Sequence, residues 1–415
     1  MKSIVKFFIL VCGICLLNAC DETGQNGEKP SPIVESTVII TAIHGGATIT
    51  YDIPEDRGIL YVMAEYERNG KPFTERSSTF KNSITIEGFD TVDPVNVILY
   101  TVSRDQEIKS DPLKVQFVPL ESPISLIVKS TVIEPTFGGI LISWENNTKI
   151  EVGVRIMLEE EGEMIEKEMF FSNLESERRP FRGLEPVETS FCFVFEDKWG
   201  NVSNPILYTG IPFFEKEVPK PWGDLRHTIP YDNVTANGTN TFDKLWDGSL
   251  ELTGRYLNVS GSTGSSFTFD LKNVFKLSRF TLWYYHNNGA SVSANCSEWE
   301  MWGTKTLDLV KEHSYWLHPF SAAQTGQQLP AHTFMDDWVY LGRYKAPDVF
   351  ERGLSAAAIV EIILGGFSYD IPLVCDPVRY IRFFPITTYG VTPPQNNYWM
   401  IGEMSFFGDD SVSQE

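Results

Sequence analysis

A weak internal repeat is the feature of this sequence that most restricts its possible folds. Residues 45–51 (GGATITY) match residues 138–144 (GGILISW), 93 positions further on. Residues 97–105 match residues 189–197 at an offset of 92. Two matches at nearly one period indicate two copies of one domain. Apolar and polar residues alternate within the matched segments, as in half-buried strands. The sequence therefore predicts two tandem β-sandwiches of roughly ninety residues each.

The second copy carries a motif that narrows the fold. Residues 195–203 (FEDKWGNVS) resemble the last hairpin of fibronectin type III-like domains, where an Asp-x-x-Gly-Asn-x-Ser turn joins the final two strands. The first copy lacks the Gly-Asn, so we expect its last hairpin to differ. Trp144 resembles the core tryptophan of such sandwiches, the alternative being an aromatic binding strip. The resemblance implies immunoglobulin-like domains at residues 37–119 and 120–212.

The composition restricts the partners. A chain of 415 residues is too long for one core, and two to four domains are expected. The formal net charge is −21, and such a chain lacks the clustered Lys and Arg that nucleic-acid phosphates require. We therefore exclude non-specific nucleic-acid binding and expect a neutral ligand rather than a polyanion.

The N-terminus indicates export. Residues 1–19 combine a short basic region with an apolar run that is too short to span a bilayer. The run ends in Leu-Asn-Ala before Cys20, which resembles a bacterial lipobox and implies lipidation of Cys20. An ordinary secretory signal cut near Ala19 is the alternative. The acidic pair Asp21-Glu22 resembles the surface-export signal of Bacteroidota lipoproteins, which implies the outer face of the outer membrane. Residues 20–36 are expected to form a flexible tether.

Cysteine use fits an exported chain without a disulfide framework. After removal of the signal and lipidation of Cys20, only Cys192, Cys296 and Cys375 remain. Three cysteines in separate segments do not form a paired set. Either Cys296 and Cys375 pair, or both are buried free thiols.

The last part of the chain has its own pattern. Residues 213–240 are expected to form a linker and the strand that leads into a third unit at residues 241–408. A short helix is expected within residues 350–364, where three alanines are adjacent. The expected strands of this unit cover residues 266–271, 277–285, 298–303, 338–344, 379–385 and 400–407.

This unit contains, in order, Trp246-Asp247-Gly248, then FTFDL, LSRFTL, RYIRF and finally IGEMSFFG. This order of motifs resembles the discoidin, or coagulation-factor type C, jelly roll with its galactose-binding-like fold. Lys272 replaces the glycine that the family has after Asp-Leu, and residues 305–337 form a longer insert than expected. The fold class is therefore predicted as all-β, with two tandem immunoglobulin-like sandwiches followed by a discoidin-like jelly roll. This architecture resembles that of lipoproteins from Bacteroidota polysaccharide-utilisation loci.

The resemblance implies a structural calcium site. In many discoidin-like sugar-binding modules, an Asp of the opening turn and a Glu of the last strand help to hold Ca²⁺. Asp247 and Glu403 match those positions, and hard oxygen ligands suit this ion. The alternative is that Asp247 caps its own turn and that Glu403 pairs with an Arg.

The long insert contains the richest cluster of aromatic residues and histidines. Sugar rings stack on aromatic side chains, and their hydroxyls need fixed donors and acceptors. The alternative is that these aromatics fold the insert onto the sandwich. The candidate ligand-binding residues are Trp316, His313, His318, Tyr315 and Trp246.

The resulting interpretation is a non-catalytic, lipid-anchored surface protein that binds carbohydrate. Its partners would be a poly- or oligosaccharide and an outer-membrane importer complex or a surface hydrolase. The first alternative is an adhesion protein that binds another protein or a host surface. The second is a glycosidase or lyase in which Glu298 and Glu300 act as paired carboxylates on one strand face. No standard catalytic motif is present, so no catalytic residue is predicted.

Overall fold

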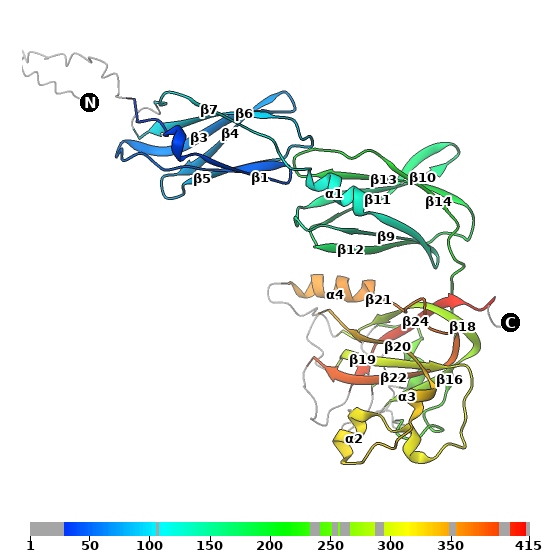
Figure 1. Ribbon diagram of the computed structural model, residues 1–415. Helices are drawn as coiled ribbons and strands as arrows, with labels where there is room; N and C mark the ends of the chain where they lie inside the picture. The colour runs from blue at the N-terminus through cyan, green and yellow to red at the C-terminus, as the bar shows by residue number, and fades with distance from the viewer. Residues whose placement is uncertain are drawn as a thin grey trace, which may run out of the picture.

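The computed structural model has three β-rich units in chain order, the first two placed end to end and the third beside the second (Figure 1). The predicted signal segment, Cys20 and part of the tether lie outside the described residues. These are residues 29–104, 108–232, 241–250, 256–257, 266–286, 294–347, 354–389 and 399–411.

The first unit is a sandwich of two antiparallel sheets. One has the strand order β1-β2-β5 and the other β4-β3-β6-β7. Alternate residues such as Ile49, Val62 and Val97 point between the sheets and are fully buried. Residues 105–107 of its last hairpin lie outside the described part. Its elements are η1 (Glu35–Thr37), β1 (Ile39–Ile43), β2 (Gly46–Thr50), β3 (Ile59–Arg68), β4 (Lys71–Ser78), β5 (Ser83–Glu87), β6 (Val95–Ser103) and β7 (Leu113–Phe117).

The second unit repeats this arrangement, with sheets β12-β9-β8 and β11-β10-β13-β14. Trp144 is buried in its core, as the core interpretation predicted. A short helix that the sequence analysis missed begins the unit. Ser122 caps this helix and Pro123 occupies its first turn. The elements are α1 (Pro123–Ser130), β8 (Val132–Thr136), β9 (Gly139–Glu145), β10 (Val152–Glu160), β11 (Glu163–Ser172), β12 (Ser176–Arg182), β13 (Thr189–Asp197) and β14 (Ile206–Gly210).

The repeated glycines have the same structural role in both units. A Cβ atom on Gly46 would lie 2.0 Å from the carbonyl oxygen of Ile86, and one on Gly139 would lie 1.8 Å from that of Phe181. In each case a neighbouring strand approaches the backbone too closely for any side chain. The matched sequence segments thus reflect a shared steric requirement of two equivalent strand pairs.

The third unit is a larger sandwich whose two sheets share one long strand, β18 (Phe267–Trp283). The order is β15-β24-β18-β22-β19-β20, with β16 and β21 also paired to β18. Strand β18 replaces two separate expected strands, and it bulges where Lys272 adopts a positive φ of 75°. The predicted fold class is confirmed. The remaining strands are β15 (Lys216–Glu217), β16 (Gly223–Asp224), β17 (Tyr256–Leu257), β19 (Cys296–Thr304), β20 (Val339–Lys345), β21 (Phe367–Asp370), β22 (Val378–Thr388), β23 (Met400–Ile401) and β24 (Glu403–Asp409).

Helices in this unit are short. The expected helix begins at Ala356, because Ser355 caps it. The insert, for which no helix was expected, contains three brief helical segments. The helices are η2 (Phe242–Leu245), η3 (His313–Trp316), α2 (Pro319–Thr325), α3 (Phe334–Asp337) and α4 (Ala356–Gly365). Among the described residues, no helix is long and apolar enough to cross a membrane. Cys296 and Cys375 are both buried free thiols, so the possible disulfide between them is absent.

A buried carboxylate fixes the second unit to the third. Glu215 accepts hydrogen bonds from Ser278 Oγ at 2.6 Å and from Arg279 Nη2 at 2.9 Å. Arg182 of the second unit lies with Nη1 3.8 Å from Glu215 and with Nη2 2.6 Å from Asp370 Oδ1. A network of charged groups in a junction with little solvent exposure holds two units in one orientation more firmly than an isolated surface ion pair does.

We predict that Glu215→Ala loosens this junction without unfolding either unit. The variant removes the carboxylate that Arg279 binds and that Arg182 faces, so the third unit should sample more orientations. Small-angle X-ray scattering should show a larger radius of gyration and a broader distance distribution than in the unaltered protein. Glu134→Ala, an exposed change on β8, is the control. Superimposable scattering curves for Glu215→Ala and the unaltered protein would contradict the assignment.

Candidate functional site

A pocket of about 550 Å³ lies on the third unit, between the insert and the outer face of the sheet formed by β22, β19 and β20. Helices α2 and α3 of the insert cover that face, away from the second unit (Figure 1). Strand alternation explains which residues reach the pocket. On β19, Trp299 and Met301 point into the core, so Glu300 points outward. The pocket is lined by Glu300, His318, Pro319, Phe320, Met335, Arg343 and Ile386.

A buried ion pair joins the linker to the sheet, and its arginine also binds the insert through the Trp316 carbonyl. Arg382 on β22 lies with Nη2 3.4 Å from Asp232 Oδ1, and the two side chains are 1% and 0% exposed. Arg382 also donates from Nε to Ser266 Oγ at 2.9 Å, from Nη1 to the Trp316 carbonyl at 3.0 Å and from Nη2 to the Pro230 carbonyl at 3.1 Å. One guanidinium thus joins three separate chain segments, around residues 230–232, 266 and 316, to β22. A buried charge needs such a set of partners.

The aromatic residues of the insert form a second small core over this sheet. Trp316 and Trp338 pack edge to face with ring centroids 6.1 Å apart, and Phe334 packs against Trp338 at 5.9 Å. The Arg382 guanidinium lies over the Phe334 ring at 4.4 Å. The insert is therefore folded onto the sandwich, which is the alternative that the sequence analysis left open.

The polar wall of the pocket consists of His318, Glu300 and Arg343, and Glu298 binds Arg343 from outside the lining. His318 Nε2 lies 3.0 Å from Glu300 Oε2. Arg343 donates from Nε to Glu298 Oε1 at 2.8 Å, and its Nη1 lies 3.6 Å from Glu300 Oε1. The last distance is too long for a hydrogen bond, so Glu300 Oε1 and the outer nitrogens of Arg343 face each other with bonding capacity left.

The protonation state of this wall follows from its contacts. The backbone N–H of Phe320 donates to His318 Nδ1 at 3.2 Å, so the imidazole carries its proton on Nε2 and donates it to Glu300. Burial is the main cause that lowers the pKa of His318. Burial alone would raise the pKa of Glu300, but the His318 hydrogen bond and the charge of Arg343 together lower it by more, so the net shift is downward. The pocket therefore presents an ionised carboxylate beside a neutral imidazole at neutral pH.

The other walls are apolar. The His318 ring stacks on Phe384 with centroids 3.8 Å apart, and Phe320 meets Phe384 edge to face at 6.0 Å. Ile386 and Met335 complete this surface. A carboxylate and a guanidinium beside aromatic and aliphatic groups suit a small ligand that has both hydroxyls and C–H faces.

The structure places the five predicted ligand-binding residues in different environments. Of these, only His318 lines the pocket. Trp316, at 1% exposed, and Tyr315 are buried, so their rings are unavailable to a ligand. His313 is exposed and lies with Nδ1 3.0 Å from the Tyr231 hydroxyl, outside the pocket lining. Trp246 packs against the third unit's main core, with its ring 5.0 Å from that of Phe242.

The burial of Trp316 and Tyr315 has a physical reason. The insert buries its large aromatics because they cover an otherwise exposed sheet face, and burial of aromatic area is strongly stabilising. The sequence analysis also missed pocket residues. Arg343 could have been found, because it lies directly opposite Glu300 in the β19–β20 register and is the basic residue of that expected strand. Phe320, Met335 and Ile386 carry no signal that separates them from core residues.

Asp247 and Glu403 lie near one another, but both have local partners. Asp247 accepts from the Ser249 N–H at 3.0 Å, thereby capping its turn, and from Lys244 Nζ at 2.6 Å. Lys220 Nζ is 3.8 Å from Glu403. Burial, followed by the nearby Asp247 charge, raises the pKa of Glu403. No group of three acidic, His or Cys side chains suited to a metal occurs within the described ranges. Calcium binding stays a prediction.

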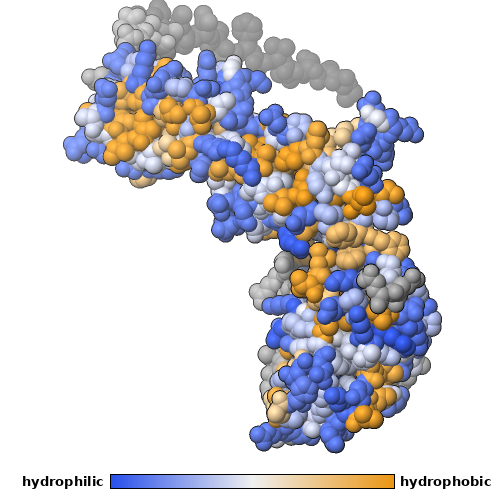
Figure 2. All heavy atoms as spheres, turned by 45° about the vertical axis from the view of Figure 1, so that its right-hand side comes forward, coloured by the Kyte–Doolittle hydropathy of each residue, from blue (hydrophilic) through white to orange (hydrophobic). Residues whose placement is uncertain are grey.

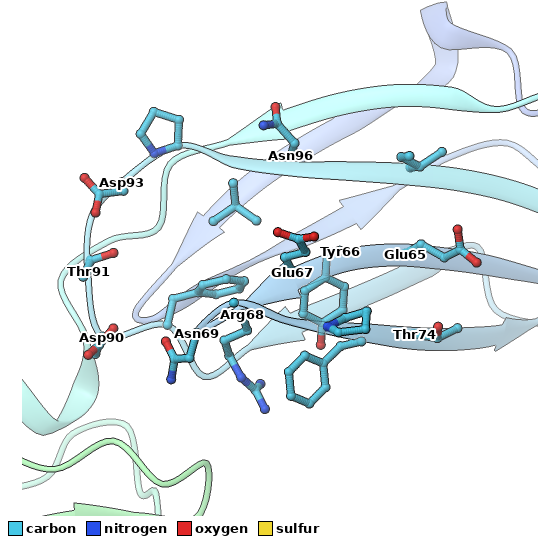
Figure 3. A pocket seen from close by; sticks show the side chains of 17 residues that line it. Glu65, Tyr66, Glu67, Arg68, Asn69, Thr74, Asp90, Thr91, Asp93 and Asn96 are labelled. Atoms are coloured by element: carbon cyan, nitrogen blue, oxygen red, sulfur yellow. The ribbon is translucent and has the colours of Figure 1, made fainter.

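A larger hollow of about 800 Å³ on the first unit has less suitable chemistry (Figure 3). Its aromatic ring Phe73 is already covered, because Tyr66 stacks on it at 5.8 Å and the Arg68 guanidinium lies 4.2 Å from its centroid. Both contacts cover part of the Phe73 ring. Its remaining charged groups are predominantly acidic: Glu65, Glu67, Asp90 and Asp93.

Three family profiles match the chain, one for each unit. They are described as Domain of unknown function (DUF4959) over residues 30–119, Domain of unknown function (DUF5126) over residues 120–221 and a Domain of unknown function (DUF5000) over residues 242–408. None of the descriptions assigns an activity. No curated protein matches the sequence.

Several solved structures are similar in part. SusE-like protein BT2857 is 20% identical, covering 68% of this chain and 97% of its own, with a TM-score of 0.36. The GH31 CBM32-2 module bound to GalNAc is 15% identical (45% and 98% covered, TM-score 0.27). A two-domain fibronectin type III segment of chicken tenascin is 12% identical (43% and 98% covered, TM-score 0.21). Similarities this weak do not identify what the chain binds.

We predict that Arg382→Met destabilises the third unit by about 3–5 kcal/mol, because it leaves Asp232 as an unpaired buried charge. Urea unfolding followed by tryptophan fluorescence measures this, since most tryptophans lie in the third unit. Arg343→Met, which removes a half-exposed arginine, should cost less than about 1 kcal/mol. The double change Arg382→Met with Asp232→Leu should recover part of the loss. Equal stability of Arg382→Met and Arg343→Met would contradict the role of the ion pair.

Proposed function

We propose that this protein is a non-catalytic glycan-binding protein whose third unit captures a poly- or oligosaccharide in the pocket between the insert and the sheet. The observation that carries the proposal is the position of Glu300 and Arg343, side by side above an apolar surface that includes Phe320. The resemblance of this unit to discoidin-like modules supports the same class of ligand.

The geometry suits a pair of adjacent sugar hydroxyls. One hydroxyl would donate to Glu300 Oε1 and its neighbour would accept from Arg343 Nη1, since these two atoms are 3.6 Å apart. The C–H face of the same ring would rest on Phe320 and Ile386. On binding, the sugar hydroxyls would lose hydrogen bonds to water and gain hydrogen bonds to the protein, so the affinity at a single site would be modest.

The charge of the pocket favours neutral glycans. Glu300 in the lining and Glu298, which binds Arg343 from outside it, together outweigh the charge of Arg343, because His318 is neutral. A uronate or sulfate group placed between them would be repelled by at least one carboxylate. The net negative charge of the whole chain also disfavours anionic glycans.

We do not propose catalysis by Glu298 and Glu300, for an electrostatic reason. A glycosidase acid must remain protonated near neutral pH, which requires a raised pKa. The pKa of Glu300 is instead lowered overall, although burial alone would raise it. Glu298 is held by Arg343 Nε. Both carboxylates are thus placed as hydrogen-bond acceptors rather than as a general acid and its partner.

We also propose that Cys20 is lipidated and that the chain faces outward from the outer membrane. The first two units would then be spacers, because the first unit and α2 lie at opposite ends of the molecule (Figure 1). An outer-membrane importer complex or a surface hydrolase would receive the captured glycan. Many copies on one surface would raise the avidity for a polysaccharide.

A second candidate function, binding of a protein partner, is favoured by a different observation. The first two units expose several large apolar side chains, and their surface carries broad hydrophobic areas (Figure 2). Phe80 is 100% exposed, and Leu207 on the edge strand β14 is 72% exposed. Exposed apolar patches often mark protein–protein contacts. This function does not compete with the pocket, since the two surfaces lie on different units.

The proposal predicts that residues 21–415 bind at least one neutral polysaccharide in isothermal titration calorimetry. A panel should contain neutral, uronate-containing and sulfated polysaccharides, and the neutral members should bind more tightly. A folded protein that binds none of them would refute the proposal. Crosslinking on intact cells to one dominant protein, without competition by sugars, would favour the second candidate.

We further predict that Arg343→Ala weakens binding of the tightest panel member by about tenfold. The change removes one or two hydrogen bonds to the ligand, each contributing about 0.5–1.5 kcal/mol. Phe320→Ala should have a similar effect through lost ring contact. Arg57→Ala, an exposed arginine on the first unit, is the matched control and should bind normally. Unchanged affinity in both pocket variants would place the glycan elsewhere.

A further inference from the structure

His318 connects three parts of the pocket that would otherwise be independent. Its side chain is only 7% exposed. Nδ1 accepts from the Phe320 N–H, Nε2 donates to Glu300, and the ring stacks on Phe384. Phe320 and Glu300 are the residues to which the proposed function assigns the apolar and the acceptor contact. One imidazole therefore positions both.

The hydrogen bond from the Phe320 N–H to His318 requires an imidazole without a proton on Nδ1. His318 is the N-cap of α2, a helix of seven residues that begins at Pro319. A cap must accept a hydrogen bond from the first turn, and loss of a cap typically costs about 1 kcal/mol. Protonation of Nδ1 would set its new N–H against the Phe320 N–H. The cap would become a repulsive contact, and a helix this short has little stability of its own.

We propose that His318 is a pH-sensitive positioning residue: neutral, it holds Phe320 and Glu300 in the binding arrangement, and protonated, it releases the start of α2 and opens the pocket. Glycan would thus be held at neutral pH and released in acid. This inference rests on the proposed function for the identity of the ligand. The conformational step itself requires no ligand.

The surroundings of His318 set the pH range. Facing it are Glu300 on β19, Arg343 on β20 and Arg382 on β22. Burial and the two arginines oppose a positive charge, whereas Glu300 favours it, and the net effect lowers the pKa of His318. Helix α2 carries no charged residue. The two aspartates of α3, Asp336 and Asp337, are bonded instead to Thr333, Tyr315 and His332.

The direction of the effect follows from this shift. The unfolded chain takes up the His318 proton near the ordinary imidazole pKa of about 6.5, whereas the folded pocket takes it up at lower pH. The contribution of His318 to stability is therefore full above about pH 6.5. It declines as the pH falls from there toward the lowered pKa. The pocket should open within or below that range.

Nuclear magnetic resonance tests the conformational step directly on residues 21–415. Nitrogen-15 labelling of histidine should show His318 as the Nε2–H tautomer at about pH 7.5. A fluorine-labelled phenylalanine at position 320 should shift on acidification with the same midpoint as His318. An Nδ1–H tautomer, or a Phe320 signal that does not move with His318, would overturn the proposal.

A matched pair of variants assigns the midpoint. In His318→Asn, a side-chain oxygen can still cap α2 but does not titrate, so the Phe320 signal should lose its pH response above about pH 5. His332→Asn removes an exposed histidine of the same insert and should leave the midpoint unchanged. A Phe320 response that persists in His318→Asn would show that another group is the switch.

Binding separates this inference from the proposed function. Galactomannan, a neutral polysaccharide, serves as the probe at about pH 7.5 and about pH 5. If it binds, affinity should fall at least tenfold in acid for the unaltered protein and much less for His318→Asn. Equal loss in both proteins would overturn the role of His318. If galactomannan does not bind at either pH, glycan binding loses support, and the resonance measurements still decide the switch.

Discussion

The ion pair of Arg382 and Asp232 is the interaction on which the functional part of this structure depends. The outer face of the β22–β19–β20 sheet would normally meet water, and the long insert would be a loop. The Arg382 guanidinium instead joins β22 to Asp232, Ser266 and the Trp316 carbonyl inside a region sealed by aromatic rings. Removal of either charge would leave the other buried and unpaired, which is far costlier than the net gain of the intact pair. With the pair in place, the hydrogen bond from Arg382 to the Trp316 carbonyl holds the insert in one position on the sheet.

The pocket is a consequence of that position. With the insert fixed, α2 begins beside Glu300, and His318 can cap α2 and bind Glu300 with the two nitrogens of one ring. The binding surface thus combines a rigid sheet, which supplies Glu300 and Arg343, with a short helix, which supplies Phe320. Sites that join a rigid element to a weakly stable one can be specific and still open on a small perturbation.

The sequence predicts the scaffold far better than the site, and the residues show why. Repetition and period-two alternation reveal strands, because they reflect backbone geometry, and the Gly46 and Gly139 contacts explain the matched motifs. Even Lys272, which departs from the family glycine, adopts the positive φ that a glycine would. The aromatic cluster of the insert is visible in the sequence, but its direction is not. Trp316 is buried because Arg382, 66 residues away, holds its carbonyl, and no local pattern encodes that contact.

The central claim is that a glycan occupies the pocket between the insert and the sheet. The most direct measurement is a crystal structure of residues 21–415 with a neutral oligosaccharide bound. The account predicts that a sugar ring lies on Phe320 with adjacent hydroxyls on Glu300 and Arg343. A sugar bound instead at the opening turn near Trp246, or in the hollow of the first unit, with the pocket empty, would contradict it.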